Sequence, residues 1–570
     1  MNAPRKAFLA ARMAIGDEQL LLLAAILIGV YAGLAVVCFR LAIQWLRLML
    51  LGSSLNPSFP RIAVVPAASG LVIAAFVVLA FPAVRGSGVN QTKAALYIYD
   101  GYISFRTVIG KFLTSAVAIG SGQSLGPEDP SLQIGAGLAS ALGRWLKLPR
   151  DQMRYIAPIG AAAGLAAAFN SPITAVLFVI EEVIGRWTAG VLGAVVLSAV
   201  ASVVTEQWFL GDEPLFRVPP YHLAHGAELL AYAALGLIGG LVSLVFVKSV
   251  AALRPRLRAL PPWTWYLQPA VAGLFVGFVG LRFPQVMGAG YEFIDQAMHD
   301  QYGWRVLLAL GVLKVVTTTA SFVSGTPGGL FAPTLFIGAM LGGAVCAIER
   351  LVAPGITGPI GAYALVGMGT LFAGIIRAPM TSVFMIVEVS GNYSIILPVM
   401  ISNTIAYLVS RQFQEHALFD VLARQEGTVL PSMEEERESD VETVEDAMRD
   451  VTGVTLSGDE SLAAGIARAE QVPAAGFFLV DLGAGVWGGL SRSELDHLQA
   501  ISAHDVLLRT IAAPLALPYL YPDQSTVTAL RVLHGRPFIP VVHRADRTRL
   551  EGMLALEDVL RAMARAERIK

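Results

Sequence analysis

Residues 159–182 read IGAAAGLAAAFNSPITAVLFVIEE, and a related stretch, VGMGTLFAGIIRAPMTSVFMIVEV, occupies residues 366–389. Four residue types keep the same spacing in both, pairing Gly160 with Gly367, Pro172 with Pro379, Thr174 with Thr381 and Glu181 with Glu388. Upstream, PSLQIGAGL from Pro130 matches PTLFIGAML from Pro333. Two elements recur in the same order, which indicates an internal duplication.

The composition is that of a membrane protein. Of the 570 residues, 55% are hydrophobic and 15% are charged, and the mean hydropathy is +0.63. Soluble proteins average about 25% charged residues. Apolar runs such as LLLAAILIGVYAGLAVVCF from Leu21 and VLGAVVLSAVASVV from Val191 recur, and about 20 apolar residues cross a bilayer core. Many membrane spans are therefore expected.

The charges and cysteines exclude several classes of function. The 41 basic and 42 acidic residues give a net charge of −1, which offers no attraction for nucleic acid. Arg5, Lys6 and Arg12 precede the first apolar run, which predicts a cytoplasmic N-terminus, and that run is too long for a signal peptide. Because Cys38 and Cys346 lie in apolar segments, neither a disulfide framework nor a thiolate metal site is expected.

Glycine and proline interrupt many of the apolar segments. Three breaks stand out, RGSGVNQ from Arg85, LGPEDP from Leu125 and GGLFAP from Gly328. Non-helical backbone at membrane depth is tolerated only inside protein or beside water, so such breaks mark a permeation path or a ligand site. A helix that starts at a break presents unpaired N–H groups and a dipole of about half a positive charge. These helix N-termini are expected to bind an anion weakly enough to let it pass.

The stretch GPEDP at residues 126–130 places two acids, Glu128 and Asp129, between prolines. Acids and proline are both favoured in the first turn of a helix, so ordinary capping explains them. A carboxylate at the mouth of an anion site has a second use, because it can fill the site when ionised and leave it when protonated. On this second interpretation Glu128 is a gate and proton carrier, while Asp129 remains a capping residue.

The last quarter of the chain reads as a separate module. PSMEEERESDVETVEDAMRD at residues 431–450 is acidic and poor in aliphatic residues, which predicts a boundary. Beyond it, the strand-like runs FFLV and FIPVV are each followed by a glycine turn and a helix. The two turns read GGLSRSEL from Gly488 and GMLALEDV from Gly552. A pair of similar α/β units is therefore expected.

Taken in order, these motifs resemble the CLC family of chloride channels and chloride/proton exchangers. The family signatures run GSGIP, then GREGP followed by a QIG stretch, then GGxFAP, and residues 162–182 nearly match another family segment. The resemblance spans most of the first 425 residues. The paired units of the tail resemble a CBS (cystathionine-β-synthase type) module.

The resemblance implies an all-α polytopic membrane protein with an internal inverted repeat and many tilted and broken helices, followed by a C-terminal α/β CBS-like pair. It implies a homodimer in the plasma membrane or bacterial inner membrane, with both termini cytoplasmic. The expected divisions are an N-terminal segment at 1–17, a transport domain at 18–425 with halves at about 18–210 and 225–425, an acidic linker at 426–442, and the pair at 443–570, split into about 443–500 and 505–570.

The resemblance also assigns roles. Glu128 would be the external gate and proton carrier, and Glu182 the internal proton acceptor. The anion would be bound by residues of one motif and by the backbone N–H groups of a second, which together are Ser87, Gly88, Asn90, Leu330 and Phe331. Glu181 recurs as Glu388, whereas Glu182 is replaced by Val389 in the second copy. Glu181 is therefore interpreted as structural.

In the CBS-like turn motif, an aspartate at the seventh position often contacts an adenosine ribose. Asp558 fits this pattern and Glu494 does not. No cofactor is required for transport. An adenine nucleotide in the pair and a dimerisation module without nucleotide both stay open.

Several positions depart from the family pattern, and all lie on the expected anion path. Pro127 replaces a basic residue and Asp129 replaces a glycine, so the outer mouth is expected to lose a positive charge and gain a negative one. Asn90 replaces a proline and could aim an amide donor at the anion. Phe419 stands where the family has an anion-binding tyrosine. Chloride is then expected to bind weakly, or the site to suit a flatter anion such as nitrate or bicarbonate.

Other functions remain as alternatives. The leading hypothesis is exchange of a small anion, most simply chloride, for protons. A passive anion channel of the same fold is the nearest rival, since the lost hydroxyl would loosen coupling. A membrane-embedded hydrolase is disfavoured, because His222, His225 and His299 lie in polar stretches without metal or nucleophile spacing. A nucleotide sensor that the helices merely anchor is the last alternative.

Overall fold

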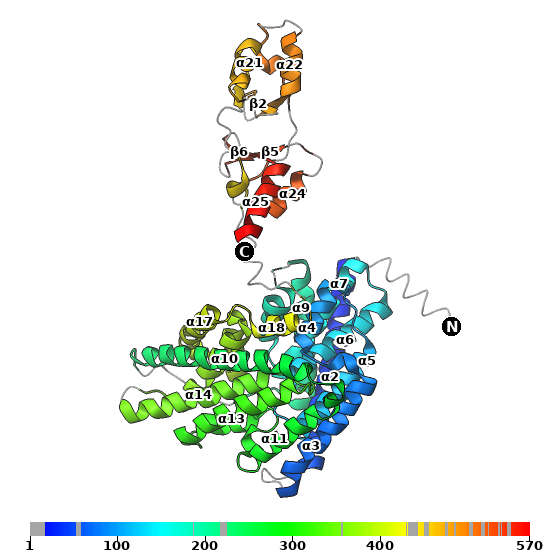
Figure 1. The fold of residues 1–570 in the computed structure, drawn as a ribbon, viewed down its shortest axis with the longest axis vertical. Helices are drawn as coiled ribbons and strands as arrows, with labels where there is room; N and C mark the ends of the chain where they lie inside the picture. Colours follow the sequence, from blue (N-terminus) through cyan, green and yellow to red (C-terminus); the bar gives the residue numbers. More distant parts are fainter. Residues whose placement is uncertain are drawn as a thin grey trace, which may run out of the picture. The chain divides into compact units, whose positions relative to one another are not determined.

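A computed structural model describes the greater part of the chain and divides it into two compact units, Met1–Met433 and Glu434–Lys570 (Figure 1). The described residues are 17–52, 59–185, 187, 189–216, 225–354, 357–428, 430, 443–449, 455–472, 477–483, 486–500, 505–514, 519–522, 524–533, 536, 538–543 and 549–569. The N-terminal basic residues, His222 and most of the acidic linker lie outside them.

Helices make up the first unit (Figure 1). The first half contains α2 (Asp17–Leu51), α3 (Phe59–Ala75), η1 (Phe76–Ala80), η2 (Pro82–Val84), α4 (Gly88–Tyr97), α5 (Phe105–Gly120), α6 (Glu128–Leu146), α7 (Arg150–Phe169), α8 (Pro172–Phe178), η3 (Val179–Ile184) and α9 (Ala189–Leu210). The second half contains α10 (Glu228–Arg258), η4 (Pro262–Tyr266), α11 (Gln268–Gly280), η5 (Pro284–Val286), α12 (Tyr291–Met298), α13 (Trp304–Val323), α14 (Phe331–Val352), α15 (Ile360–Ile376), α16 (Pro379–Ser390), η6 (Tyr393–Ile395), α17 (Ile396–Phe413) and α18 (Leu418–Gln425).

Within the described residues, 7 helices are long and apolar enough to cross a membrane. They cover Gln19–Leu51, Arg61–Ala80, Gly190–Leu210, Glu228–Arg258, Trp304–Val323, Phe331–Val352 and Tyr393–Gln425. Several carry large exposed apolar side chains along their length, which suits contact with lipid. Helix α4, which follows the first break, has only 10 residues. The predicted fold class, a polytopic helical membrane domain with broken helices, is confirmed.

The duplication appears as equivalent helix pairs. Helix α6 packs against α7 through Gly135 and Gly160, and α14 packs against α15 through Gly338 and Gly367. A Cβ on Gly135 would lie 2.2 Å from the carbonyl oxygen of Gly160, and one on Gly338 would lie 2.3 Å from that of Gly367. The two helices of each pair therefore touch backbone to backbone, which only glycine permits.

The two halves also cap each other reciprocally. Glu181 accepts hydrogen bonds from the N–H and hydroxyl of Thr381 at 2.9 and 2.8 Å. Glu388 accepts from the N–H and hydroxyl of Thr174 at 2.7 and 2.6 Å. Each glutamate thus satisfies the first N–H groups of a short helix in the other half. Reciprocal contacts of this kind arise where two copies are related by a two-fold axis.

The second unit has two small α/β cores. One sheet has strand order β1-β2-β3-β4, formed by β1 (Thr455–Ser457), β2 (Phe477–Asp481), β3 (Trp487–Ser491) and β4 (Ala513–Pro514). The other pairs β5 (Phe538–Val542) with β6 (Leu550–Ala555). The accompanying helices are α20 (Val444–Ala447), α21 (Leu462–Glu470), α22 (Arg492–Ala500), α23 (Leu508–Ile511), α24 (Thr526–Leu533) and α25 (Leu556–Ile569). Two separate clusters of buried apolar residues form the cores.

The predicted strands FFLV and FIPVV are confirmed as β2 and β5, but the predicted glycine turns are wrong. Gly488 lies in β3 and Gly552 in β6, and each strand runs antiparallel to its predecessor. The glycine of β6 is required by packing, since a Cβ on Gly552 would lie 2.4 Å from the sulfur of Met448. Glycine in a strand can mark such a close approach as well as a turn.

Candidate functional site

The three Gly-rich breaks each lead into a helix, as predicted. Helix α4 begins at Gly88, α6 at Glu128 and α14 at Phe331. Gly86 and Gly325 have φ values of +87° and +84°, which glycine adopts freely and other residues rarely do. The first N–H groups of each helix lack partners inside their own helix. Each break thus presents N–H donors that can bind a carboxylate side chain or a free anion.

Two of these breaks are joined through the backbone. The N–H of Gly126 donates to the carbonyl of Gly329 at 2.8 Å, and the N–H of Gly329 donates to the carbonyl of Gly126 at 2.7 Å. Both residues directly precede the first turn of a helix, α6 in one case and α14 in the other. The two helix N-termini therefore meet where the two halves of the unit meet.

Glu128 is fully buried at the N-terminus of α14. Its Oε2 accepts a hydrogen bond from the N–H of Ala332 at 3.3 Å. Its Oε1 has no hydrogen-bond partner among the described residues. The side chain therefore starts on the first turn of α6 and ends on the first turn of a helix from the other half, with one oxygen able to accept a proton.

Asp129 points to a third helix. Its Oδ1 accepts from the hydroxyl of Ser87 at 2.8 Å and from the N–H of Val89 at 3.1 Å, and its Oδ2 accepts from the N–H of Gly88 at 2.8 Å. Ser87 also caps α4 by accepting from the N–H of Val89 at 3.1 Å. The interpretation of Asp129 as a capping residue is therefore incomplete, because it caps α4 as well as beginning its own helix.

A buried lysine accompanies Asp129. The Nζ of Lys111 lies 3.8 Å from Oδ2 of Asp129 and donates to the carbonyls of Val84 and Gly86 at 3.4 and 3.1 Å. Lys111 is 0% exposed, and the two carbonyls and the nearby carboxylate compensate its charge. An ammonium group in this position also attracts any anion near the N-terminus of α4.

Asn90 and Phe419 contact each other across α4 and α18. The amide nitrogen of Asn90 donates to the carbonyl of Phe419 at 2.8 Å. Its Oδ1 has no hydrogen-bond partner within the part of the chain that is described. The amide donor expected to serve an anion is thus engaged with the backbone of α18.

An aromatic cluster surrounds Phe331. The ring of Phe331 lies 5.2 Å from that of Phe178, 5.6 Å from Phe372, 5.9 Å from Phe419 and 6.3 Å from Phe169, measured between centroids. All five rings are hydrocarbon. With Phe419 in the tyrosine's place, this wall beside the N-terminus of α14 offers no hydroxyl donor.

Glu182 belongs to a buried ionic triad. Its Oε1 lies 3.0 Å from the Nζ of Lys93, which also reaches Oδ1 of Asp420 at 3.5 Å. The side chains of Lys93, Glu182 and Asp420 are 1%, 8% and 13% exposed, so all three groups rely on one another for compensation. Glu182 lies on η3, a π-helical turn, and such turns are frequent at functional sites.

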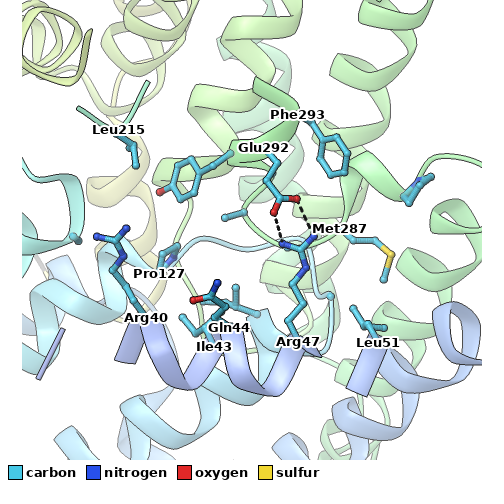
Figure 2. Close-up of a pocket in the computed structure, with 18 of the residues that line it drawn as sticks. Arg40, Ile43, Gln44, Arg47, Leu51, Pro127, Leu215, Met287, Glu292 and Phe293 are labelled. Atoms are coloured by element: carbon cyan, nitrogen blue, oxygen red, sulfur yellow. Dashed lines mark hydrogen bonds and ion pairs between the residues drawn. The ribbon is translucent and has the colours of Figure 1, made fainter. Parts of the chain in front are cut away.

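A cavity of about 370 Å³ opens beside the N-terminus of α6 (Figure 2). Arg40 and Arg47 of α2 line it, together with Pro127 and Glu292. Arg47 binds Glu292 with two contacts of 3.0 and 3.4 Å. The expectation that Asp129 adds negative charge to such a mouth is wrong, because its carboxylate is buried at α4. Both arginines of α2 are paired with carboxylates, Arg40 with Glu206 at 2.6 Å and Arg47 with Glu292 at 3.0 Å.

In the second unit, Asp558 and Glu494 each accept a hydrogen bond at the N-terminus of their own helix, α25 and α22 respectively. Asp558 is 4% exposed, accepts from the N–H of Ala555 at 3.1 Å and lies 2.5 Å from Nε of Arg449. Glu494 accepts from the N–H and hydroxyl of Ser491, both at 2.7 Å, and these bonds lower the pKa of Glu494. These contacts explain both acids without a nucleotide.

The sequence motifs do not indicate Lys93, Lys111 or Asp420 as residues of the site. The signal was available, since a lysine inside an otherwise apolar membrane segment is costly and usually functional. Their partners could not be read from the sequence, because Lys93 and Asp420 lie 327 residues apart. Among the described residues, no group of three or more histidine, cysteine, aspartate or glutamate side chains could hold a metal ion.

The model of the voltage gated chloride channel family matches residues 69–411 of this chain. The chain is 32% identical over 397 residues to a ClcB-like chloride channel protein of Ralstonia nicotianae, covering 67% of this chain and 92% of that protein. It is 30% identical over 399 residues to the H(+)/Cl(−) exchange transporter ClcA of Vibrio campbellii, covering 68% and 85%. A slow cyanobacterial Cl−/H+ antiporter has a similar fold, with a TM-score of 0.65 at 23% identity over 71% of this chain and 97% of that one.

Proposed function

Because the chain belongs to the voltage gated chloride channel family, we propose that it exchanges small anions for protons across a membrane, with Glu128 as the gate. The observation that carries this proposal is the place of the Glu128 carboxylate, which accepts from the first turn of α14 as a transported anion would. The carboxylate, which is covalently attached to the protein, thus takes the place of a transported anion. The relative of this chain in Vibrio campbellii is named as an H(+)/Cl(−) exchange transporter.

The exchange follows from competition for shared donors. When ionised, Glu128 fills the N-terminus of α14 and excludes a mobile anion. When Oε1 takes a proton from one side, the neutral carboxyl loses its attraction for the helix dipole and leaves the donors to an anion. The backbone N–H groups of Leu330 and Phe331 then face that anion. Returning the side chain requires the proton to leave, so one movement is tied to the other.

Protons would reach the site from the other side through the triad. Lys93, Glu182 and Asp420 together carry one excess negative charge when all three are ionised, and one added proton neutralises them. Glu182 is the proposed internal acceptor, because the triad keeps one negative charge in excess even while Glu182 is paired with Lys93. A proton leaving Glu128 thus has a buried group of carboxylates to move to.

A passive channel is the second candidate, and the triad is the observation that favours it. A glutamate held by a buried lysine gives up its ion pair whenever it takes a proton, which opposes protonation. If the pair never opens, anions pass without protons. Chloride is the proposed substrate. Nitrate or bicarbonate is the alternative, because the aromatic cluster around Phe331 offers no hydroxyl donor for chloride.

The arrangement in the cell is also part of the proposal. The basic residues before α2 support cytoplasmic termini, and the family resemblance supports a homodimer. The expected divisions are kept, with the transport domain at 18–425 and the CBS-like pair at 443–570. Asp558 would be the nucleotide contact in that pair, if Arg449 released it.

Proton pumping in liposomes tests the function. Purified full-length protein is reconstituted with high chloride inside, and the external pH is followed after a potassium ionophore is added. Exchange predicts that outward chloride flow drives protons into the liposomes, so that the external pH rises although no pH gradient is imposed at the start. Chloride efflux with no proton movement would support the channel instead, and the absence of any anion flux would reject both. Parallel runs with nitrate, bicarbonate and fluoride rank the anions.

A further inference from the structure

Two adjacent acids occupy two different helix N-termini. Glu128 reaches α14, whereas Asp129 accepts from the hydroxyl of Ser87 and from the N–H groups of Gly88 and Val89. The position is crowded, because a Cβ on Gly88 would lie 2.6 Å from the carbonyl oxygen of Asp129. The α4 terminus therefore holds a carboxylate that belongs to the protein itself.

The donors at α4 are fully committed to that carboxylate. A serine hydroxyl has a single hydrogen, and Ser87 donates its hydrogen to Asp129 at 2.8 Å. Asp129 is 2% exposed and Ser87 is also 2% exposed, so water does not compete for these bonds. A mobile anion can use the same donors only after Asp129 has moved away.

The second half of the protein has an equivalent lysine site that lacks the acid. Lys314 donates to the carbonyls of Val286 and Gly288 at 3.0 and 2.7 Å, as Lys111 does to Val84 and Gly86. The position equivalent to Asp129 in the second copy is Ala332, by the register that pairs Pro130 with Pro333. A lysine that donates to two loop carbonyls thus occurs in both halves, whereas the acid, Asp129, occurs only in the first. Lys111 does not require Asp129 in order to be accommodated.

We propose that Asp129 is a built-in anion that competes with the transported ion at the N-terminus of α4 and thereby sets its affinity and selectivity. This proposal rests on the proposed function, because it concerns the same pathway. Glu128 and Asp129 then act at neighbouring sites, the first as the gate at α14 and the second as the occupant of α4. A mobile anion must replace a carboxylate held by three donors and a buried ammonium group. Removing that carboxylate leaves the donors and Lys111 to the mobile ion.

Affinity measurements test the competition. Chloride and nitrate are titrated calorimetrically into the purified full-length wild type and into Asp129→Gly and Asp129→Asn, each checked for a single species by size exclusion. If Asp129 occupies α4 for nine-tenths of the time or more, its loss tightens the apparent Kd by about tenfold or more. Glu228→Gln is the matched control, because Glu228 is 0% exposed and accepts from Tyr232. It should leave the Kd unchanged.

An unchanged Kd in both Asp129 variants would overturn the proposal. A second measurement does not depend on the variants folding. Crystals of the wild type soaked in bromide should show no anomalous density in contact with the Ser87 hydroxyl wherever Asp129 keeps its hydrogen bond to Ser87. Bromide bound to Ser87 beside an Asp129 that still accepts from Ser87, Gly88 and Val89 would also overturn the proposal.

The flux and Kd measurements test the transport function and the built-in anion separately. If the wild type moves anions in liposomes but the Kd of the Asp129 variants does not change, exchange survives and the built-in anion is rejected. If Asp129→Gly binds anions more tightly while no variant moves them, the competition survives and the transport function is rejected.

Discussion

The Nζ of Lys93 lies 3.0 Å from Oε1 of Glu182, and both side chains are buried within the membrane unit. A lysine at this depth is tolerated because two carboxylates, those of Glu182 and Asp420, face it. The proposed inner proton acceptor is therefore a member of an ion pair, which sets how readily it takes a proton.

Lys93→Met is expected to destabilise the protein. It leaves two buried carboxylates facing each other without a cation, and removing one partner of a buried pair costs about 3–5 kcal/mol. Thermal unfolding of the full chain in detergent measures the loss. Arg150→Met is the control, because Arg150 and Asp100 form an exposed pair whose loss costs about 1 kcal/mol or less. Equal shifts in the two variants would contradict the burial argument.

Glu182→Gln should stop proton movement and spare anion flux, because the amide cannot carry a proton across the inner step. Glu181→Gln provides the neighbouring control. Glu181 caps α16 through Thr381, so its variant should lose about 0.5–2 kcal/mol of stability and keep its coupling. The ratio of proton to anion flux in liposomes distinguishes them. Coupling lost in Glu181→Gln and kept in Glu182→Gln would reverse the assignment.

Phe419→Tyr should tighten chloride binding. The new hydroxyl would restore a donor beside the N-terminus of α14, and a hydrogen bond to a charged group contributes about 1.5–3 kcal/mol, which is roughly tenfold or more in Kd. Titration calorimetry measures it. Phe372→Tyr places a hydroxyl elsewhere in the same aromatic cluster and should not tighten binding. No gain in Phe419→Tyr would mean that residue 419 does not face the anion.

Glu494 should make the second unit sensitive to acid. The Ser491 N–H and hydroxyl lower the pKa of Glu494 in the folded state. A lowered pKa contributes stability above the unfolded value, and that stability is lost as pH falls through the folded value. Because the side chain is largely exposed, the effect is about 1 kcal/mol or less. Glu494→Gln should lower the Tm at pH 7 and remove this part of the acid dependence, whereas Glu470→Gln should not.

The family and the membrane fold could be predicted because they depend on local patterns. The duplicated stretch, the Gly-rich breaks and the apolar runs each determine where a helix starts or ends, and these starts are confirmed at Gly88, Glu128 and Phe331. The pairing of Glu181 with Glu388 across the duplication also predicted their structural role, which the reciprocal caps explain.

The partners of the buried charges could not be predicted. Asp129 precedes a proline at the start of α6, and nothing local indicates that its carboxylate reaches α4. Lys93 meets Glu182 and Asp420 only because α4, η3 and α18 come together in the fold. The predicted glycine turns are wrong because Gly488 and Gly552 lie inside β3 and β6, and a glycine inside a strand and one in a turn look alike in sequence.

Parallel measurement of anion and proton flux in Glu128→Gln tests the central claim most directly. An uncharged side chain no longer competes for the N-terminus of α14, so anion flux should persist or rise while proton flux falls to the level of empty liposomes. Asp300→Asn, which alters an exposed ion pair with Arg350, should leave both fluxes coupled. Continued anion-driven proton pumping in Glu128→Gln would contradict the account.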